Sequence, residues 1–408
     1  MKPYNRFGNI ITAPGEVIRG VILSNGVTMI YFDNSATTFP SDRVRTVIND
    51  MLRDEFSGNP GSLHKLGVAA DKAYCDTQAK VADLLGAYGS EIIFTSCATE
   101  SANTAIRGFM SRNGRAGKRV ISTRTEHKAS LECLALLEKS GYEVVYLPVG
   151  TDGKPDLAEL EKAMTGEKTA LLCFTLVNNE TGSVLPLDQI TALRNRLSPD
   201  TKIYLDAVQA LGKMPINLHK MNVDMCSFSG HKIHSVKGNG VLYVKDGIRI
   251  DPFILGGGQQ KGMRSGTQSL LLAKAFEVAL EEAVETMEGS HEDISKINEY
   301  LRKELTKRDA RILSPDDALP NVLNVAFEGF ESETMLHCLE IYDIFVSTVS
   351  ACSSKAKKVS YVLLESGVDR KTAANAVRLS FSRYNTMKEA EDFIKTVDDI
   401  YDKFAVMK

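Results

Sequence analysis

The residues best suited to chemistry in this sequence surround Lys232, in the run Ser-Phe-Ser-Gly-His-Lys-Ile-His over residues 227–234. Strand-forming residues lead up to Phe228, and a turn of small polar residues then presents the lysine beside a histidine and a hydroxyl. A lysine that is partly desolvated among apolar neighbours loses proton affinity, so its amine can attack a carbonyl and form a Schiff base. Because most lysines are only surface charges, other segments must support this interpretation.

The elements that must position Lys232 alternate between helix and short apolar strand. We expect strands at 91–96, 119–123, 143–148, 169–176, 202–207, 224–228 and 240–244, and helices at 41–52, 68–86, 99–112, 128–140, 156–164 and 187–197. This alternation predicts an α/β fold with a mostly parallel sheet covered by helices. Ligands of such sheets bind at the carboxyl ends of the strands.

We predict a large domain and a smaller one. The 408 residues, 43% of them hydrophobic, are enough for both. We assign the large domain to residues 41–287, and residues 29–40 and 288–408 to a smaller α+β domain. Residues 1–28, which are irregular, are expected to be an N-terminal extension or the product of start-codon choice, with a short hairpin over 21–29 as the alternative.

Composition and charge exclude several classes of partner. The formal net charge of −3 leaves no basic excess for a nucleic-acid backbone. No apolar run approaches the ~20 residues that cross a membrane, and the N-terminus lacks the plan of a signal peptide, so we expect a cytoplasmic protein. The seven cysteines are an odd number without Cys-x-x-Cys spacing, which argues against a disulfide framework or a metal site.

Four of the predicted strands end on polar groups. Strand 91–96 runs into residues 97–100 (Cys-Ala-Thr-Glu), where the free N–H groups and positive end of a helix form a seat for a phosphate together with the Thr99 hydroxyl. Helix capping by Thr99 is the alternative there. The next strand ends carry these side chains: His127, Asn179, Asp206 and, one turn later, Gln209. Any one could be an ordinary loop residue, but polar groups at every strand end indicate a binding site.

Together with Lys232 these groups describe a pocket for pyridoxal phosphate. Lys232 would hold the aldehyde as an imine, Asp206 would keep the pyridine nitrogen protonated, and His127 could stack on the ring, so that the cofactor becomes an electron sink. The remaining groups would bind the phosphate and the ring substituents: the backbone of Ala98 with Thr99, Ser229 and His231 at the phosphate, and Asn179 and Gln209 at the ring.

A series of motifs runs from residue 29 to about residue 400: YFDNSATT, GNPGSLHKLG, ATES, TEHKA, VNNETG, LDAVQALGK, SFSGHK, GGGQQKGMRSGT, SACSS and VRLSFSR. In this order they resemble the cysteine desulfurases of the NifS/IscS group, within the class V aminotransferases. SFSGHK with GMRSGT and SACSS is highly specific. The resemblance implies the fold of the pyridoxal-phosphate-dependent transferases, fold type I.

The resemblance assigns the same roles to the cofactor-binding residues and adds further contacts. Thr267 matches a threonine that reaches the phosphate of the neighbouring subunit, so the resemblance implies a homodimer. Arg378 matches the arginine that grips the substrate carboxylate, a task that suits the guanidinium fork. We assign Asn34 to the same substrate site.

Cys352 determines which reaction the resemblance implies. It matches the nucleophile that attacks the sulfur of cofactor-bound L-cysteine, releases alanine and keeps the sulfur as a persulfide. Residues 349–358 around it are small and polar and include three lysines, whose positive charge favours the thiolate. With Lys232 and His127 it completes the predicted catalytic set. The sulfur would pass to an acceptor protein, either an iron–sulfur scaffold or a tRNA-thiolation enzyme.

Four sites depart from the family pattern, and three other functions stay open. Cys97 replaces a glycine, Leu255 a histidine and Thr348-Val349 a Ser-Gly pair, while His-Ser-Val at 234–236 stands where glycine and proline are common. A selenocysteine lyase would use the same pocket with a weaker need for the catalytic cysteine. A plain aminotransferase would not need it, and a weakened paralogue would serve as a sulfur-trafficking scaffold.

Overall fold

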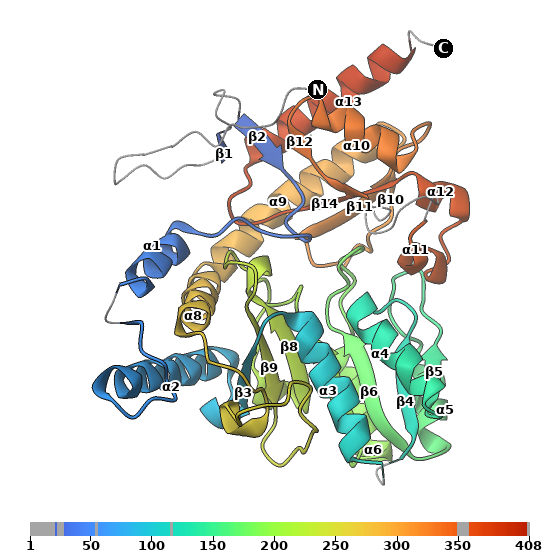
Figure 1. Ribbon diagram of the computed structural model, residues 1–408. Helices are drawn as coiled ribbons and strands as arrows, with labels where there is room; N and C mark the ends of the chain where they lie inside the picture. The colour runs from blue at the N-terminus through green and yellow to red at the C-terminus, as the bar shows by residue number, and fades with distance from the viewer. Residues whose placement is uncertain (1–20, 23–27, 54–55, 115–116, 349–358, 406–408) are drawn as a thin grey trace.

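A seven-stranded sheet lies at the centre of the part of the molecule that carries Lys232 (Figure 1). Its strand order is β3-β9-β8-β7-β6-β4-β5. The bounds are β3 Ile92–Thr95, β4 Arg119–Thr123, β5 Glu143–Leu147, β6 Thr169–Thr175, β7 Lys202–Asp206, β8 Met225–Ser229 and β9 Gly240–Val244. Strands β8, β7, β6, β4 and β5 are parallel, and β9 pairs antiparallel with β3 and β8. The predicted mostly parallel α/β sheet is therefore confirmed.

The structure is a computed structural model that describes residues 21–22, 28–53, 56–114, 117–348 and 359–405. Most of the predicted N-terminal extension lies outside these residues, and so does Cys352. None of the helices in the described ranges is long and apolar enough to cross a bilayer.

Helices cover both faces of the large sheet because its strands are apolar on both sides. Val120 and Ile121, neighbours on β4, are both fully buried and belong to opposite cores. One core holds α3 and α4, and the other holds α2, α5, α6, α7 and α8. Their bounds are α2 Lys65–Leu85, α3 Ala98–Arg112, α4 Lys128–Lys139, α5 Leu157–Thr165, α6 Leu187–Leu197, α7 Leu218–Met221 and α8 Leu270–Glu285, and α1 spans Asp42–Met51.

A third core, the small-sheet core, forms around the four-stranded antiparallel sheet β10-β11-β14-β13. The strands are β10 Arg311–Ile312, β11 Val322–Ala326, β13 Ser347–Thr348 and β14 Ala376–Ser380. The helices of this part are α9 Met287–Thr306, α10 Ser332–Glu340, α11 Tyr361–Glu365, α12 Arg370–Ala374 and α13 Met387–Ala405. Because α8 and α9 serve different cores, we propose that the boundary between the two predicted domains falls between them.

The chain before α1 belongs to the small-sheet core. Strand β2 (Thr28–Tyr31) pairs in parallel with β12 (Ile344–Phe345), and Phe32 is fully buried against Phe381 and Phe393. β1 (Val21–Ile22) pairs antiparallel with β2, the pairing that the hairpin interpretation of residues 21–29 predicts. Residues 33–41 then cross back to the large sheet and pass beside Lys232.

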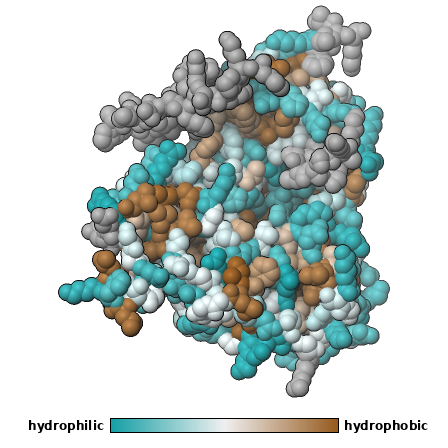
Figure 2. Space-filling view, viewed as in Figure 1, coloured by the Kyte–Doolittle hydropathy of each residue, from teal (hydrophilic) through white to brown (hydrophobic). Residues whose placement is uncertain are grey.

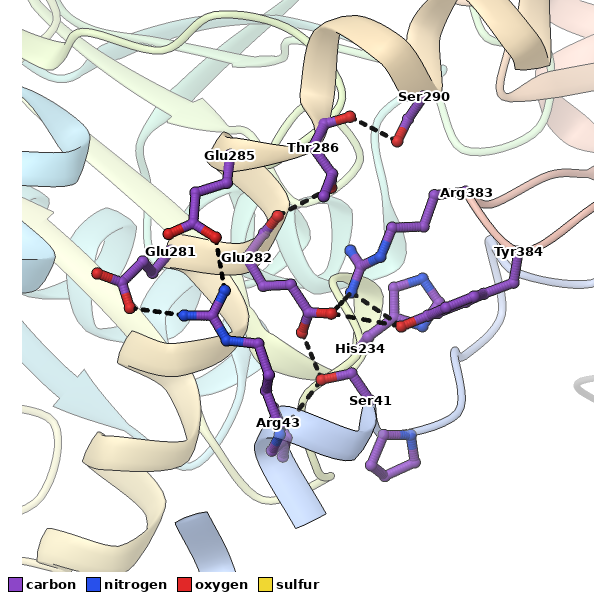
Figure 3. Close-up of polar contacts among 12 residues, drawn as sticks. Ser41, Arg43, His234, Glu281, Glu282, Glu285, Thr286, Ser290, Arg383 and Tyr384 are labelled. Atoms are coloured by element: carbon purple, nitrogen blue, oxygen red, sulfur yellow. Dashed lines mark hydrogen bonds and ion pairs between the residues drawn. The ribbon is translucent and has the colours of Figure 1, made fainter. Parts of the chain in front are cut away.

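Polar contacts join α8 to the segment that follows β14 (Figure 3). The Glu282 carboxylate accepts a hydrogen bond from Ser41 Oγ and pairs with Arg383 Nη2 at 3.0 Å. The side chains of Glu282 and Arg383 are only 14% and 11% exposed. On the same helix Glu285 pairs with Arg43, and those two side chains are 54% and 44% exposed.

We expect Glu282→Ala to lower the free energy of unfolding by about 2–3 kcal/mol, because it leaves a mostly buried guanidinium without its acid. Glu285→Ala is the matched control on the same helix, and loss of its exposed ion pair should change the free energy by less than about 1 kcal/mol. Urea unfolding of both variants measures the difference. Equal effects of the two substitutions would contradict the proposal that the Glu282–Arg383 pair stabilises the contact between α8 and the segment after β14.

Candidate active site

A cavity of about 270 Å³ lies at the carboxyl ends of the parallel strands. The structure brings to it every residue predicted to bind the cofactor except Thr267: Ala98, Thr99, His127, Asn179, Asp206, Gln209, Ser229, His231 and Lys232. These residues come from five separate segments of the chain, which the parallel sheet brings together at the ends of its strands. Ser35, Cys97 and Thr175 also line the cavity.

Lys232 ends a short 3₁₀ turn, Gly230–Lys232, that directly follows β8. Its Nζ donates hydrogen bonds to the carbonyl oxygens of Ser35 at 2.5 Å and Ala36 at 2.7 Å. Burial, together with the positive charge of Arg378, lowers the pKa of Lys232 to about 8. The expected loss of proton affinity is thus present, and it brings the nucleophilic amine within reach of neutral pH.

Asp206 is the last residue of β7 and is buried in the wall of the cavity. One carboxylate oxygen accepts a hydrogen bond from the backbone N–H of Val208 at 3.0 Å. Burial raises the pKa of Asp206, while the neighbouring His127, the Val208 N–H and the positive charge of Lys232 oppose that shift. A buried carboxyl group of this kind is stabilised in its ionised form by a cation placed beside it.

The orientation of His127 follows from its position as the N-cap of α4. Its Nδ1 accepts a hydrogen bond from the backbone N–H of Ala129 at 3.1 Å. Because a backbone N–H can only donate, the neutral imidazole must carry its proton on Nε2. His127 therefore presents an N–H donor on its second ring nitrogen.

The other end of the cavity is rich in donors. Thr99 lies in the first turn of α3, whose N-cap is Cys97 without a side-chain capping bond, so the interpretation of Thr99 as the helix cap is wrong. The buried Ser229 Oγ has no hydrogen-bond partner among the described residues. Behind them β9 passes very close, since a Cβ on Gly240 would lie 2.9 Å from the Cα of Cys97. These free donors around a helix N-terminus suit an anion.

The predicted substrate residues lie outside this cavity. Arg378, on β14, donates from Nη1 to the carbonyl of Asn179 at 3.1 Å and from Nη2 to Asp33 at 2.9 Å. Its Nε is buried and has no partner in the described part of the chain. Asn34 donates its side-chain N–H groups to the carbonyls of Tyr31 and Ser380, both at 3.0 Å.

Thr267 is exposed and does not line the cavity of its own chain. Leu255, one of the departures from the family pattern, is 78% exposed, whereas Cys97 lines the cavity. Sequence reasoning missed Ser35 and Asp33, although both lie in the motif YFDNSATT. Ser35 contributes its backbone carbonyl oxygen. Every residue type has this group, so the sequence gives no signal for it.

His234 lies two residues after Lys232 and is buried. It is 5% exposed, adopts a left-handed backbone conformation with φ 68°, and donates from Nδ1 to the carbonyl of Phe39 at 2.9 Å. Its ring meets Tyr384 edge-on, with centroids 4.8 Å apart (Figure 3). Burial and the charge of Arg383 lower the pKa of His234 to about 3.

This shift predicts that His234 makes the fold acid-sensitive. Between the folded pKa near 3 and the unfolded value of 6.5, the unfolded state binds more protons, so stability falls as pH falls through that window. Between pH 7 and pH 5, protonation of His234 in the unfolded state should lower the free energy of unfolding by about 2 kcal/mol. His234→Asn, which tolerates positive φ, should flatten the dependence of the urea midpoint on pH. An unchanged pH slope in this variant would refute the prediction.

The fold and the cavity agree with a known family of enzymes. The chain matches the aminotransferase class-V family over residues 30–393, and it belongs to that family. Within the family its relatives are named as NifS/IscS proteins and cysteine desulfurases. It is 39% identical over 384 residues to a NifS/IcsS protein homolog of Lactobacillus delbrueckii subsp. bulgaricus, covering 92% of this chain and 98% of that protein.

Other relatives and solved structures agree with this placement. Cysteine desulfurase 2 of Trichormus variabilis is 37% identical over 384 residues, which cover 92% of this chain and 94% of that protein. A solved NifS-like protein superposes with a TM-score of 0.87 at 38% identity, covering 92% of this chain and all of the other. The resemblance to the NifS/IscS group and the fold expected from it are therefore confirmed.

Proposed function

We propose that this protein is a pyridoxal-phosphate-dependent cysteine desulfurase, which converts L-cysteine to L-alanine and takes the sulfur onto Cys352 as a persulfide. The observation that carries the proposal is the cavity where Lys232, with its lowered pKa, meets Asp206, His127 and a cluster of anion-binding donors. The names of the relatives, among them several cysteine desulfurases, support the same activity.

The donor set fits pyridoxal phosphate. Ser229 Oγ, which is buried without a partner in the described structure, and the first turn of α3 would receive the phosphate. Asp206, buried at a raised pKa, would pair with the ring nitrogen, and Asn179 and Gln209 would contact the ring. When bound, the cofactor supplies an electron sink for carbanion chemistry.

The chain's own residues then perform binding and proton transfer. Lys232 would hold the cofactor, and its Nζ can move a proton, since burial and the charge of Arg378 lower its pKa to about 8. His127 lines the cavity and carries an N–H donor on Nε2. We assign the substrate carboxylate to Arg378, whose buried Nε is free among the described residues. The Cys352 thiolate attacks the substrate sulfur, so the C–S bond breaks and alanine leaves after protonation.

L-cysteine is the proposed substrate. A solved structure titled SspA in complex with cysteine matches this chain with a TM-score of 0.77 at 31% identity, covering 88% of this chain and all of the other. We propose delivery of the sulfur to an acceptor protein for iron–sulfur cluster assembly or tRNA thiolation. A cytoplasmic location belongs to the same proposal.

We further propose a homodimer in which Thr267 reaches the partner's phosphate site. Thr267 is exposed and absent from its own chain's cavity, as this arrangement requires. Figure 2 shows apolar side chains on the side of the molecule where α1 and the start of α2 lie. Four apolar residues at the end of α1 and around the start of α2 are at least half exposed: Leu52, Leu63, Leu66 and Val68. An exposed apolar surface of this kind is typical of a protein interface.

The test is to supply the purified, yellow protein with L-cysteine and a thiol reductant. We expect alanine and sulfide in equal amounts, because the reductant releases the persulfide sulfur. Conversion of the cofactor to its amine form without alanine would favour a plain aminotransferase. Activity confined to selenocysteine would favour a lyase, and a colourless, inactive protein would favour a scaffold. Any of these three results would overturn the proposed function.

A further inference from the structure

A second lysine lies behind the cofactor cavity, on the opposite side of Gln209. Lys213 Nζ donates a hydrogen bond to Gln209 Oε1 at 2.7 Å, and Gln209 Nε2 donates to the carbonyl of Ser35 at 3.0 Å. The same Ser35 carbonyl accepts from Lys232 Nζ. The two lysines are therefore joined through one glutamine amide and one backbone carbonyl.

The two neighbours determine which way the Gln209 amide faces. The Ser35 carbonyl oxygen can only accept, and the Lys213 amine donates to the other side of the amide. The amide oxygen must therefore lie toward Lys213 and the amide nitrogen toward Ser35. One N–H of Gln209 is used by Ser35, and the second remains for the cavity that Gln209 lines. A reversed amide would place two oxygens against each other at Ser35.

Lys213 occupies a costly position for a structural lysine. Desolvation lowers the pKa of Lys213 to about 7, and the charges of Lys232 and Arg378 contribute to the shift. No carboxylate of the described residues lies within ion-pair distance of the Lys213 amine, and Gln209 Oε1 accepts its hydrogen bond. Lys213 also lines a small cavity of about 30 Å³ with His234 and Arg383. A buried amine without a paired acid does not stabilise the fold.

We propose that Lys213 is a positioning residue, which fixes the amide of Gln209 so that the cofactor cavity receives an N–H donor instead of a carbonyl oxygen. This inference rests on the proposed pyridoxal phosphate site. Within that site the donor matches an anionic oxygen substituent on the cofactor ring, and a reversed amide would repel it. Lys213 acts entirely through Gln209 and touches neither cofactor nor substrate.

The test is a double-mutant cycle on the holoenzyme with two readouts besides turnover. They are the dissociation constant of pyridoxal phosphate and the pH at which the visible band is half-titrated. Lys213→Met should weaken cofactor binding about tenfold, the effect of one hydrogen bond to a charged group. The half-titration pH should rise, because the ring oxygen without its donor holds a shared proton more tightly. Lys220→Met, an exposed lysine on α7, is the control and should change neither readout.

Energetic coupling between the Lys213 and Gln209 substitutions would identify a positioning role. In a Gln209→Leu background, Lys213→Met should cause no further change in either readout, since the amide it orients is gone. Lys213→Arg, which can only donate, should restore both values, whereas Lys213→Gln should not. Gln209→Glu keeps an acceptor for Lys213 but offers no N–H to the cavity. It should therefore reproduce the Lys213→Met shift, and it tests the proposal even if Lys213→Met fails to fold.

Additive effects of Lys213→Met and Gln209→Leu, or normal cofactor binding and titration in Lys213→Met, would overturn the inference. Both outcomes are distinct from failure of the proposed function, because the wild-type protein would still bind the cofactor and desulfurate L-cysteine. Absence of the visible band in the wild type would instead reject the site as a whole.

Discussion

Replacement of Lys232 by alanine should reduce alanine formation from L-cysteine by at least ~10³-fold, since it removes both the group that binds the cofactor covalently and a proton-transfer group. The visible band should also move to that of unattached pyridoxal phosphate. The fold should not suffer, because the lysine amine carries a desolvation cost that lowers its pKa to about 8. Absorption spectra, alanine assays and urea unfolding measure these three consequences.

Lys237→Ala is the matched control, because Lys237 lies five residues further along the same loop and is exposed. It should retain activity within about twofold and keep the wild-type spectrum. A Lys232→Ala protein that kept the wild-type band, or a tenth of the activity, would show that another amine holds the cofactor. Lys213 would then be the first to examine, since its pKa is also lowered to about 7.

Cys352→Ala should abolish alanine formation while leaving cofactor binding and the visible band intact. The thiolate is the acceptor of the sulfur atom, and an alanine side chain offers no nucleophile. We expect a loss of at least about a hundredfold. The assay should follow alanine and protein-bound persulfide together, because the persulfide should disappear to the same extent.

Cys75→Ala provides a matched loss of a thiol, since Cys75 is exposed on α2. It should form alanine at the wild-type rate. If Cys352→Ala still produced alanine from L-cysteine at more than a tenth of the wild-type rate, sulfur would leave without this cysteine. The proposed persulfide step would then be wrong, although the rest of the cofactor site would stand.

The sequence alone was sufficient for the architecture of the large sheet. Strands β4 and β9 and helix α6 have the predicted bounds, Arg119–Thr123, Gly240–Val244 and Leu187–Leu197, and the other predicted elements of this part differ by only a few residues at their ends. Hydrophobic periodicity and the residues that end a strand or begin a helix are local properties, so a single chain reveals them. For the same reason, Asp206 could be placed at a strand end before its neighbours were known.

The sequence could not determine the contacts that residues 33–36 make after crossing from one sheet to the other. The ion pair of Asp33 with Arg378 joins residues 345 positions apart, and the carbonyl of Ser35 is shared by Gln209 and Lys232. Every residue type has a backbone carbonyl, so this group leaves no mark in the sequence. The orientation of a side-chain amide depends on the donors and acceptors that surround it. Residue types and spacing thus specified the members of the site, whereas tertiary packing decided their orientation and protonation, because both depend on neighbours that are distant in sequence.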